Sequence, residues 1–163
     1  MRKSIVTILL VFTAASAATA APRGLSGLSV GIGAGGLTDG YIQGEYDFTL
    51  SQYVCLGPEL MLGFGGAGAL YGGCAGRYYL IPDLHPIFQL HLPFGAGVAI
   101  EFDKDEGRGD DGGAGIYLHF GFGCDFDIPQ APISPYLDFG GFFVAGDASD
   151  ADFKVEIGAR FAI

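Results

Sequence analysis

The sequence predicts an all-β fold, an eight-stranded antiparallel up-and-down β-barrel that crosses a membrane with its strands. Half of the 163 residues are hydrophobic and the mean hydropathy is positive. Past the N-terminal segment, however, no apolar stretch approaches the ~20 residues of a membrane helix. Apolar residues instead alternate with polar or small ones along segment after segment. Such alternation gives each strand one lipid-facing side without producing a continuous apolar run.

The first twenty residues are expected to be a signal peptide. Arg2 and Lys3 precede the short apolar run Ile5 to Phe12, and Ala18-Thr19-Ala20 supplies a small-residue cleavage pattern. Residues 21–163 then form one domain, the β-barrel. Residues 1–20 hold two of the eight basic residues and none of the eighteen acidic ones, so removal of the signal peptide changes the formal net charge from −10 to −12. A strongly acidic chain without a basic patch argues against nucleic acid as a partner.

Alternation defines the first three strands. Aliphatic residues alternate with serine and glycine in residues 28–35, and aliphatic or aromatic residues alternate with Gln, Glu, Asp and Thr in residues 42–50. In residues 54–64 the apolar side opposes Cys55, Glu59 and Met61. Each segment has the period of two that is typical of a strand with two different faces.

The fourth segment, residues 69–81, has the weakest alternation. Tyr71, Arg77 and Tyr79 are expected to point inward there, and a β-bulge near Gly72-Gly73 is the expected place for a break in the pattern. The fifth, residues 87–103, is the clearest. Its large apolar residues occupy one side from Phe88 to Phe102, and polar or small residues occupy the other.

The last three segments repeat the pattern. Ile116, Leu118 and three phenylalanines oppose Tyr, His, Gly and Asp in residues 116–127. In residues 136–145 two phenylalanines and a leucine oppose Tyr, Asp and Gly, and residues 153–163 alternate as far as Ile163. The lengths of the eight segments are close to the ~9–11 residues that a tilted membrane strand needs.

The apolar face is expected to point outward. A soluble barrel would turn its large apolar side chains inward, but an eight-stranded interior is only just wide enough for side chains to fill. Here the opposite face carries about as many Gly and Ala residues as charges, which suits a narrow lumen. Two alternatives remain: a narrow channel or small-solute-binding barrel, and a soluble periplasmic lipocalin-like barrel.

The connections also alternate in character. Ser51-Gln52, residues 82–86 and residues 129–135 are short or rich in proline, whereas residues 36–40, 65–68, 104–113 and 146–151 are rich in Gly and Asp. With both termini in the periplasm, the first set is periplasmic and the second extracellular.

Inward-facing charges are the main candidate site. They are expected to form a paired network that fills the lumen, because an unpaired buried charge costs several kcal/mol. The predicted members are Glu45, Glu59, Arg77, Glu101, Lys154, Glu156 and Arg160.

Catalysis, metals and cofactors are not expected. His91 and His119 share the inward face with carboxylates, but few serines lie in strands and no G-x-S-x-G motif is present. No Cys/His spacing indicates a metal. The chain has three cysteines, so either one disulfide with one free thiol or no disulfide is possible. The predicted alternation disfavours a Cys55–Cys74 bond unless a bulge near Gly72-Gly73 is present.

The acidic segment 103–113 is the predicted extracellular contact surface. Its oxygen ligands lack the EF-hand spacing, so a solvated loop is favoured over a calcium site. The residues proposed for contact are Asp103, Asp105, Glu106, Arg108, Asp110 and Asp111.

The last eight residues run from Glu156 to Ile163 and have the order polar residue, spacer, Gly158, two spacers, Phe161, spacer, Ile163. This order resembles the C-terminal signal of outer-membrane β-barrels, although a terminal Phe is commoner than Ile. The chain from residue 21 onward resembles the small eight-stranded group, the OmpA transmembrane domain and OmpX-like proteins. The resemblance implies a monomeric bacterial outer-membrane protein with lipid as its surroundings, which the barrel assembly machinery recognises through Glu156, Gly158, Phe161 and Ile163.

Overall fold

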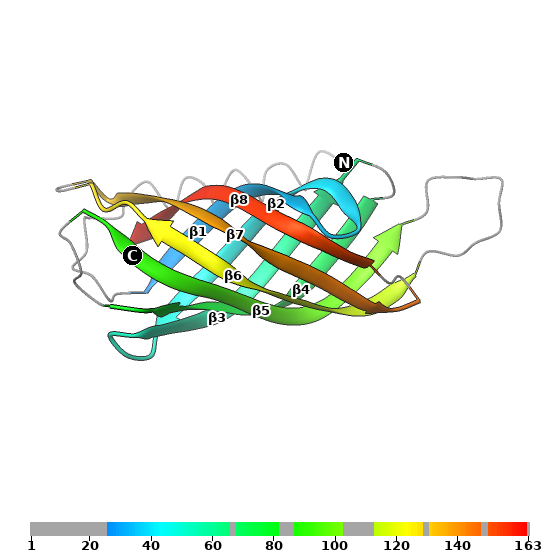
Figure 1. Ribbon diagram of the computed structural model, residues 1–163, viewed down its shortest axis with the longest axis horizontal. Helices are drawn as coiled ribbons and strands as arrows, with labels where there is room; N and C mark the ends of the chain where they lie inside the picture. The colour runs from blue at the N-terminus through cyan, green and yellow to red at the C-terminus, as the bar shows by residue number, and fades with distance from the viewer. Residues whose placement is uncertain are drawn as a thin grey trace, which may run out of the picture.

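Eight antiparallel strands close into one barrel in the computed structural model, which describes residues 26–65, 68–81, 87–102, 113–128, 131–147 and 150–162 (Figure 1). The predicted signal peptide, residues 103–112 of the acidic segment and Ile163 lie outside these ranges. No helix among the described residues is long and apolar enough to cross a bilayer. The strands are β1 (Gly27–Gly35), β2 (Thr38–Thr49), β3 (Val54–Phe64), β4 (Gly68–Tyr79), β5 (Gln89–Phe102), β6 (Ala114–Asp125), β7 (Ile133–Gly146) and β8 (Asp150–Ala162).

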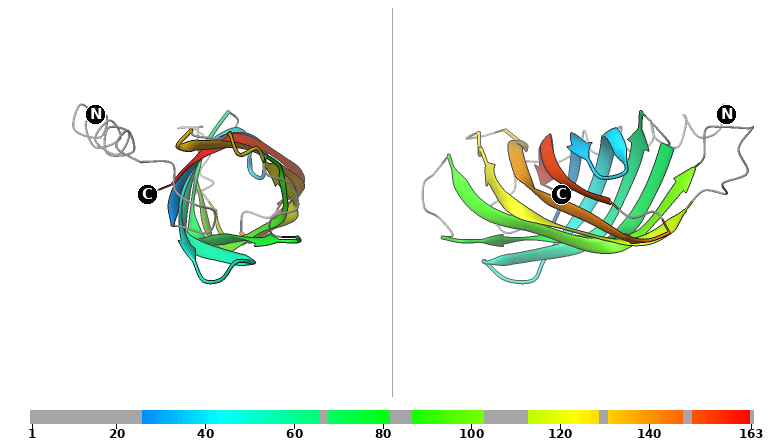
Figure 2. Two further views of the ribbon diagram at one scale, coloured as in Figure 1. Left: turned by 90° about the vertical axis from the view of Figure 1, so that its left-hand side faces the viewer. Right: turned by 45° about the vertical axis from the view of Figure 1, so that its right-hand side comes forward.

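Each strand pairs with the strands before and after it in sequence, and β1 pairs with β8 to close the ring. The view along the axis shows the closed wall (Figure 2, left). Gly27 lies opposite Ala162, so β1 begins and β8 ends at one end of the barrel, which we call the terminal end. The β1–β2, β3–β4, β5–β6 and β7–β8 connections lie at the other end, the distal end. The predicted all-β up-and-down barrel is therefore confirmed.

The large apolar side chains point outward, as predicted. Ile116, Phe120 and Ile157 are each about 60 % exposed, while alternate residues of the same strands are buried. Tyr117, His119 and Glu156, for example, are at most 4 % exposed. This arrangement is the reverse of a soluble barrel with an apolar cavity, and it is the one expected of a barrel whose outer surface contacts lipid.

Tyr71, Arg77 and Tyr79 point inward as predicted, and no bulge interrupts β4 near Gly72-Gly73. The β3–β4 register runs without a shift from Val54 opposite Tyr78 to Gly63 opposite Ala69, so β4 keeps its alternation throughout. Glycines simply occupy positions on both faces there, which weakens the sequence pattern without changing the backbone.

A register shift occurs instead in the β1–β2 pair, between Gly33 and Gly35. Gly35 has a φ of 125° and Gly36 a φ of 78°. Residues other than glycine rarely adopt positive φ angles of this kind. The chain turns tightly at this point, directly before Leu37 and Thr38.

Candidate functional site

The lumen gathers charged side chains from most of the strands. Because side chains alternate across a strand, each inward position of a closed barrel points at the same axis. Eight charged residues there are at most 5 % exposed. They are Glu45, Asp47, Glu59, Arg77, Asp125, Asp138, Lys154 and Glu156.

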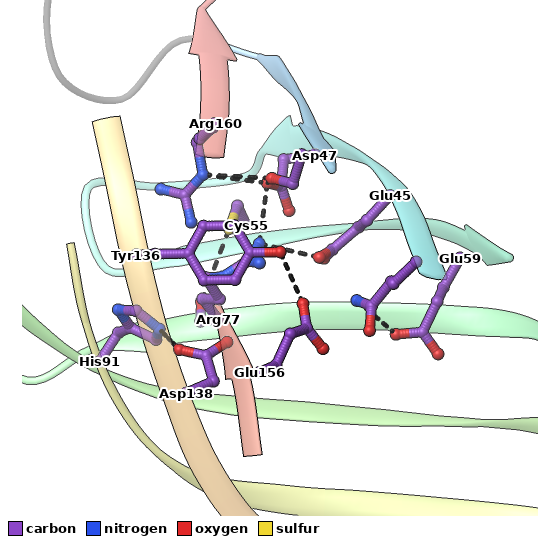
Figure 3. A network of polar contacts seen from close by, with 12 residues as sticks. Glu45, Asp47, Cys55, Glu59, Arg77, His91, Tyr136, Asp138, Glu156 and Arg160 are labelled. Atoms are coloured by element: carbon purple, nitrogen blue, oxygen red, sulfur yellow. Dashed lines mark hydrogen bonds and ion pairs between the residues drawn. The ribbon is translucent and has the colours of Figure 1, made fainter. Parts of the chain in front are cut away.

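Arg77 joins two carboxylates in the half of the lumen nearer the terminal end. Its Nη1 lies 2.9 Å from Oε2 of Glu45 and 3.0 Å from Oδ2 of Asp47. The guanidinium carbon also lies 5.0 Å from the ring centroid of Tyr136, which Figure 3 shows beside the network. Arg77 is 1 % exposed, so it depends on these partners for its charge compensation.

Arg160 links the same cluster to β6. Its Nε lies 3.3 Å from Asp47 Oδ2 and its Nη1 lies 3.0 Å from Asp125 Oδ2. The Tyr79 hydroxyl accepts a hydrogen bond from Arg160 and donates one of 3.1 Å to Asp125. The Arg160 side chain keeps 16 % exposure, so the network approaches solvent near this residue.

His91 lies between two carboxylates. Its Nε2 is 2.7 Å from Oδ1 of Asp138, and its Nδ1 is 3.6 Å from Oδ2 of Asp125. The ring itself is fully buried. The hydrogen bond to Asp138 positions the imidazole, while Nδ1 has no hydrogen-bond partner in the described part of the chain.

Glu59 and Glu156 are the main hydrogen-bond acceptors in the middle of the lumen. Glu59 accepts from Tyr117 at 2.7 Å, and Nε2 of His119 lies 3.0 Å from it. Glu156 accepts from Tyr136 at 2.6 Å and from Tyr41 at 3.0 Å.

Three further contacts join Glu59 to Glu156. Lys154 Nζ lies 3.0 Å from Oε2 of Glu156 and donates to Gln43 Oε1 at 3.3 Å. The amide of Gln43 donates in turn to Glu59 at 3.2 Å. The two glutamates therefore belong to one connected network.

An apolar section of the lumen lies on the distal side of these polar centres. We call the five large side chains Tyr41, Met61, Tyr71, Tyr117 and Phe142 the aromatic layer; each is at most 1 % exposed. The Phe142 ring centroid is 5.3 Å from that of Tyr71 and 5.6 Å from that of Tyr117. Smaller residues such as Ala69 and Ala99 fill the space around the rings.

Six of the seven predicted network residues point into this connected lumen, namely Glu45, Glu59, Arg77, Lys154, Glu156 and Arg160. Glu101 does not join them. It is the second-last residue of β5, close to the distal end, and only partly buried. Among the described residues, no ion pair links Glu101 to the other six.

The predicted network omits several residues that the structure places in it. Asp47, Asp125 and Asp138 each lie within 3.0 Å of an Arg or His nitrogen. The alternation of polar and apolar residues in the sequence already placed these three aspartates on the inward face, so it could have identified them. Phe142 has the same inward position in its strand, but its side chain is apolar, so a search for charged residues does not find it.

The lumen contains no arrangement typical of hydrolysis in the described residues. The Ser29 hydroxyl donates to Asp47 at 3.1 Å, so it bonds a carboxylate and not a histidine. Within the described ranges, no group of three His, Cys, Asp or Glu side chains is placed to hold a metal ion. Cys55, Cys74 and Cys124 are all free thiols, with Cys55 in the lumen and Cys74 exposed on the outer face.

Comparison with known proteins shows the fold. No protein-family model matches the chain, and no curated protein matches it in sequence. Among solved structures, the N-terminal β-barrel domain of Pseudomonas aeruginosa OprF has a TM-score of 0.69 at 9 % identity, over 86 % of this chain and 98 % of that one.

Two further barrels are similar. A de novo designed transmembrane β-barrel has a TM-score of 0.54 at 16 % identity, over 88 % of this chain and 98 % of the design. The attachment invasion locus protein Ail of Yersinia pestis has a TM-score of 0.52 at 13 % identity, over 87 % of this chain and all of Ail. The chain thus has the fold of small eight-stranded outer-membrane barrels.

Proposed function

We propose that this protein is a monomeric bacterial outer-membrane barrel of structural or surface-interaction type, with a lumen filled by its own side chains and no catalytic activity. One observation carries the proposal: the outer surface is apolar while the lumen holds buried, paired charges. The chain would be exported through a cleaved signal peptide at residues 1–20 and would need no cofactor.

The outer surface supports a membrane location. Ile32, Ile42, Leu118, Phe122 and Phe153 come from four different strands, β1, β2, β6 and β8, and are each more than half exposed. Apolar patches larger than several hundred Å² are rare on soluble monomers. Exposure of such a surface to water is unfavourable. A lipid bilayer removes this cost, because it solvates the apolar band that encircles the barrel.

The lumen supports a structural role. Arg77, Lys154 and Arg160 each contact at least one carboxylate, and removal of one partner from a buried ion pair typically costs ~3–5 kcal/mol. Such a network stabilises the barrel from inside.

Assembly would depend on the last strand. Glu156 lies in the lumen in the folded barrel and accepts hydrogen bonds from two tyrosines. We propose that the barrel assembly machinery recognises Glu156, Gly158, Phe161 and Ile163 before β8 pairs with β1.

The acidic segment between β5 and β6 is the proposed contact surface. Glu101 N donates to Gly113 O at 2.8 Å, so the segment leaves and re-enters the barrel at the distal end. With both termini in the periplasm, that end is extracellular. The acidic side chains of Asp103, Asp105, Glu106, Asp110 and Asp111 and the guanidinium of Arg108 would then face the medium.

Fractionation of cells that express the full chain tests the location. We expect the protein in the outer membrane, with a gel mobility that changes on boiling because the folded barrel resists detergent. Recovery from the soluble periplasm without detergent would overturn the proposal.

Trypsin added to intact cells tests the orientation. Within the barrel, Arg77 and Lys154 are buried in the lumen and Arg160 is nearly so, whereas Lys104 and Arg108 belong to the acidic segment. We expect cleavage at these two residues, and resistance of the matched variant Lys104→Gln/Arg108→Gln. Cleavage that occurs only after the outer membrane is opened would place the segment in the periplasm.

A narrow channel is the second candidate, and one observation favours it. Oε1 of Glu45, Oδ1 of Asp47 and Nη2 of Arg160 are buried without a hydrogen-bond partner in the described part of the chain. Polar atoms of this kind are normally satisfied by ordered water. Conductance of the purified protein in planar bilayers separates the two candidates, since a filled lumen passes no steady current.

A further inference from the structure

The lumen has two chemically different halves. Toward the terminal end lie the charges of Glu45, Asp47 and Arg77 together with those of Arg160 and Asp125. Toward the distal end lies the aromatic layer, in which Phe142 contacts the rings of Tyr71 and Tyr117. A solute that crosses the barrel would have to pass both halves.

The β1–β2 turn covers the aromatic layer from the distal side. Leu37 N donates to the Tyr71 hydroxyl at 3.0 Å, and the Leu37 side chain packs against the layer. Gly36 is so close that a Cβ built on it would lie 3.0 Å from Cε1 of Phe142. The turn curls toward the inside of the wall in the axial view (Figure 2, left).

The two halves resist ions in different ways. A hydrogen-bonded charge network interacts with water and with ions, and its partners can exchange. In the aromatic layer the three tyrosine hydroxyls are already hydrogen-bonded to Glu156, Glu59 and Leu37 N. The ring faces, Phe142 and Met61 are left to line the constriction, and an apolar constriction blocks ions because water does not wet it. Among the described residues, Phe142 lies at the centre of that constriction, since it joins Tyr71 of β4, Tyr117 of β6 and the β1–β2 turn.

Carboxyl groups outnumber Lys and Arg side chains in the described part of the lumen. Six carboxylates are at most 4 % exposed, whereas Arg77, Lys154 and Arg160 are the cations that face them. The described lumen therefore holds three more carboxyl side chains than Lys and Arg side chains. The six carboxylates are Glu45, Asp47, Glu59, Asp125, Asp138 and Glu156.

We propose that the aromatic layer, and not the ion-pair network, is the barrier that closes the lumen, and that the acidic lumen admits small monovalent cations in preference to anions once this barrier is opened. The inference deepens the proposed function, because it rests on a barrel that inserts in lipid with a closed lumen.

The adjacent residues Phe142 and Phe143 provide a matched pair of variants. Phe142 is 1 % exposed in the lumen, and Phe143 is 42 % exposed on the outer face of the same strand. We expect Phe142→Ala to raise K⁺ efflux from liposomes by roughly an order of magnitude, because it widens an apolar constriction. Phe143→Ala should leave efflux at the level of the unsubstituted protein.

Two further variants keep the test decisive if Phe142→Ala fails to fold. Tyr71→Ala and Met61→Ala also open the layer, and each variant is first checked for the mobility change on boiling. Increased efflux from a folded variant supports the barrier. The inference is overturned if all the folded layer variants remain closed, or if Glu45→Gln alone raises efflux as much as Phe142→Ala does.

The reversal potential in a KCl gradient tests the second half of the inference. We expect its sign to indicate cation preference for the opened variant, and the preference to fall when Glu59→Gln is added. Anion preference would overturn the acidic-lumen argument. A large current through the unsubstituted protein would instead contradict the closed lumen of the proposed function, so the two failures are distinguishable.

Discussion

His91 and Asp138 meet across a glycine. Nε2 of His91 on β5 lies 2.7 Å from Oδ1 of Asp138 on β7, although β6 separates the two strands. The register places Gly123 opposite both residues. The hydrogen-bonded pair therefore occupies the space that a side chain at Gly123 would need.

Substitution of Gly123 should separate this pair. A Cβ built there meets both Oδ1 of Asp138 and Nε2 of His91, so we expect Gly123→Ala to lower the free energy of unfolding by about 1–3 kcal/mol, as overpacking of a core does. Because the chain has no Trp, urea unfolding in lipid vesicles is followed by circular dichroism and gel mobility.

Gly44→Ala is the control for this prediction. Gly44 also lies in a strand, but a Cβ built on it has no neighbour within 4 Å. We expect a neutral effect or a gain of up to about 1 kcal/mol, since glycine weakens a strand interior. Equal losses for the two variants would show that the ion pair has no special sensitivity to position 123.

The requirement for Arg77 should become weaker when Glu45 is made neutral. Arg77→Leu leaves the buried Glu45 carboxylate without its cation, and we expect a loss of about 3–5 kcal/mol in unfolding free energy. The double variant Arg77→Leu/Glu45→Gln should recover part of that loss, because Asp47 keeps Arg160 at 3.3 Å. Absence of any recovery would mean that packing, and not charge pairing, explains the role of Arg77.

The outer surface should tolerate charge according to depth in the membrane. Leu118 and Ile128 are both 52 % exposed, but Leu118 lies inside β6 and Ile128 lies three residues beyond its end. We expect Leu118→Arg to cost about 2–4 kcal/mol in lipid and Ile128→Arg about 0–1 kcal/mol, as the depth dependence on lipid-facing strands predicts. Equal costs at the two positions would contradict a lipid-facing band.

The three cysteines should be protected in the folded barrel. Cys55 is 5 % exposed in the lumen, and Cys74 and Cys124 lie on the outer face that lipid would cover. In vesicles we expect none of them to react with a charged, water-soluble thiol reagent, and all three to react after unfolding. Ser51→Cys, at an exposed turn position, is the positive control; rapid labelling of Cys74 would place the outer face of β4 in water.

Strand alternation allowed much of the structure to be predicted from the sequence. It assigned Glu59, Arg77 and Glu156 to the lumen because polar residues recur there at a period of two. It also places position 142 on the inward face, since Phe139 and Phe143 take the outward one, but the apolar side chain of Phe142 did not mark it as a candidate. Packing across the lumen identifies Phe142, and packing is a property of the closed ring.

Backbone irregularity was harder to predict than side-chain direction. Glycines at 72 and 73 suggested a bulge in β4, but the shift occurs near Gly33 and Gly35. A glycine in a strand leaves the backbone free to bulge without requiring it to do so. The tight approach of Gly36 to Phe142 involves residues more than a hundred positions apart, which local sequence does not report.

The closure of the ring also defines a seam. Seven of the eight strand pairs join neighbours in sequence, so each can form as a local hairpin at a small loop-closure cost. The eighth pair brings Gly27 opposite Ala162 and can form only when both β1 and β8 are available. The β1–β8 pair is thus the natural last step of assembly, and until it forms both edges of the sheet remain open to pairing with another protein.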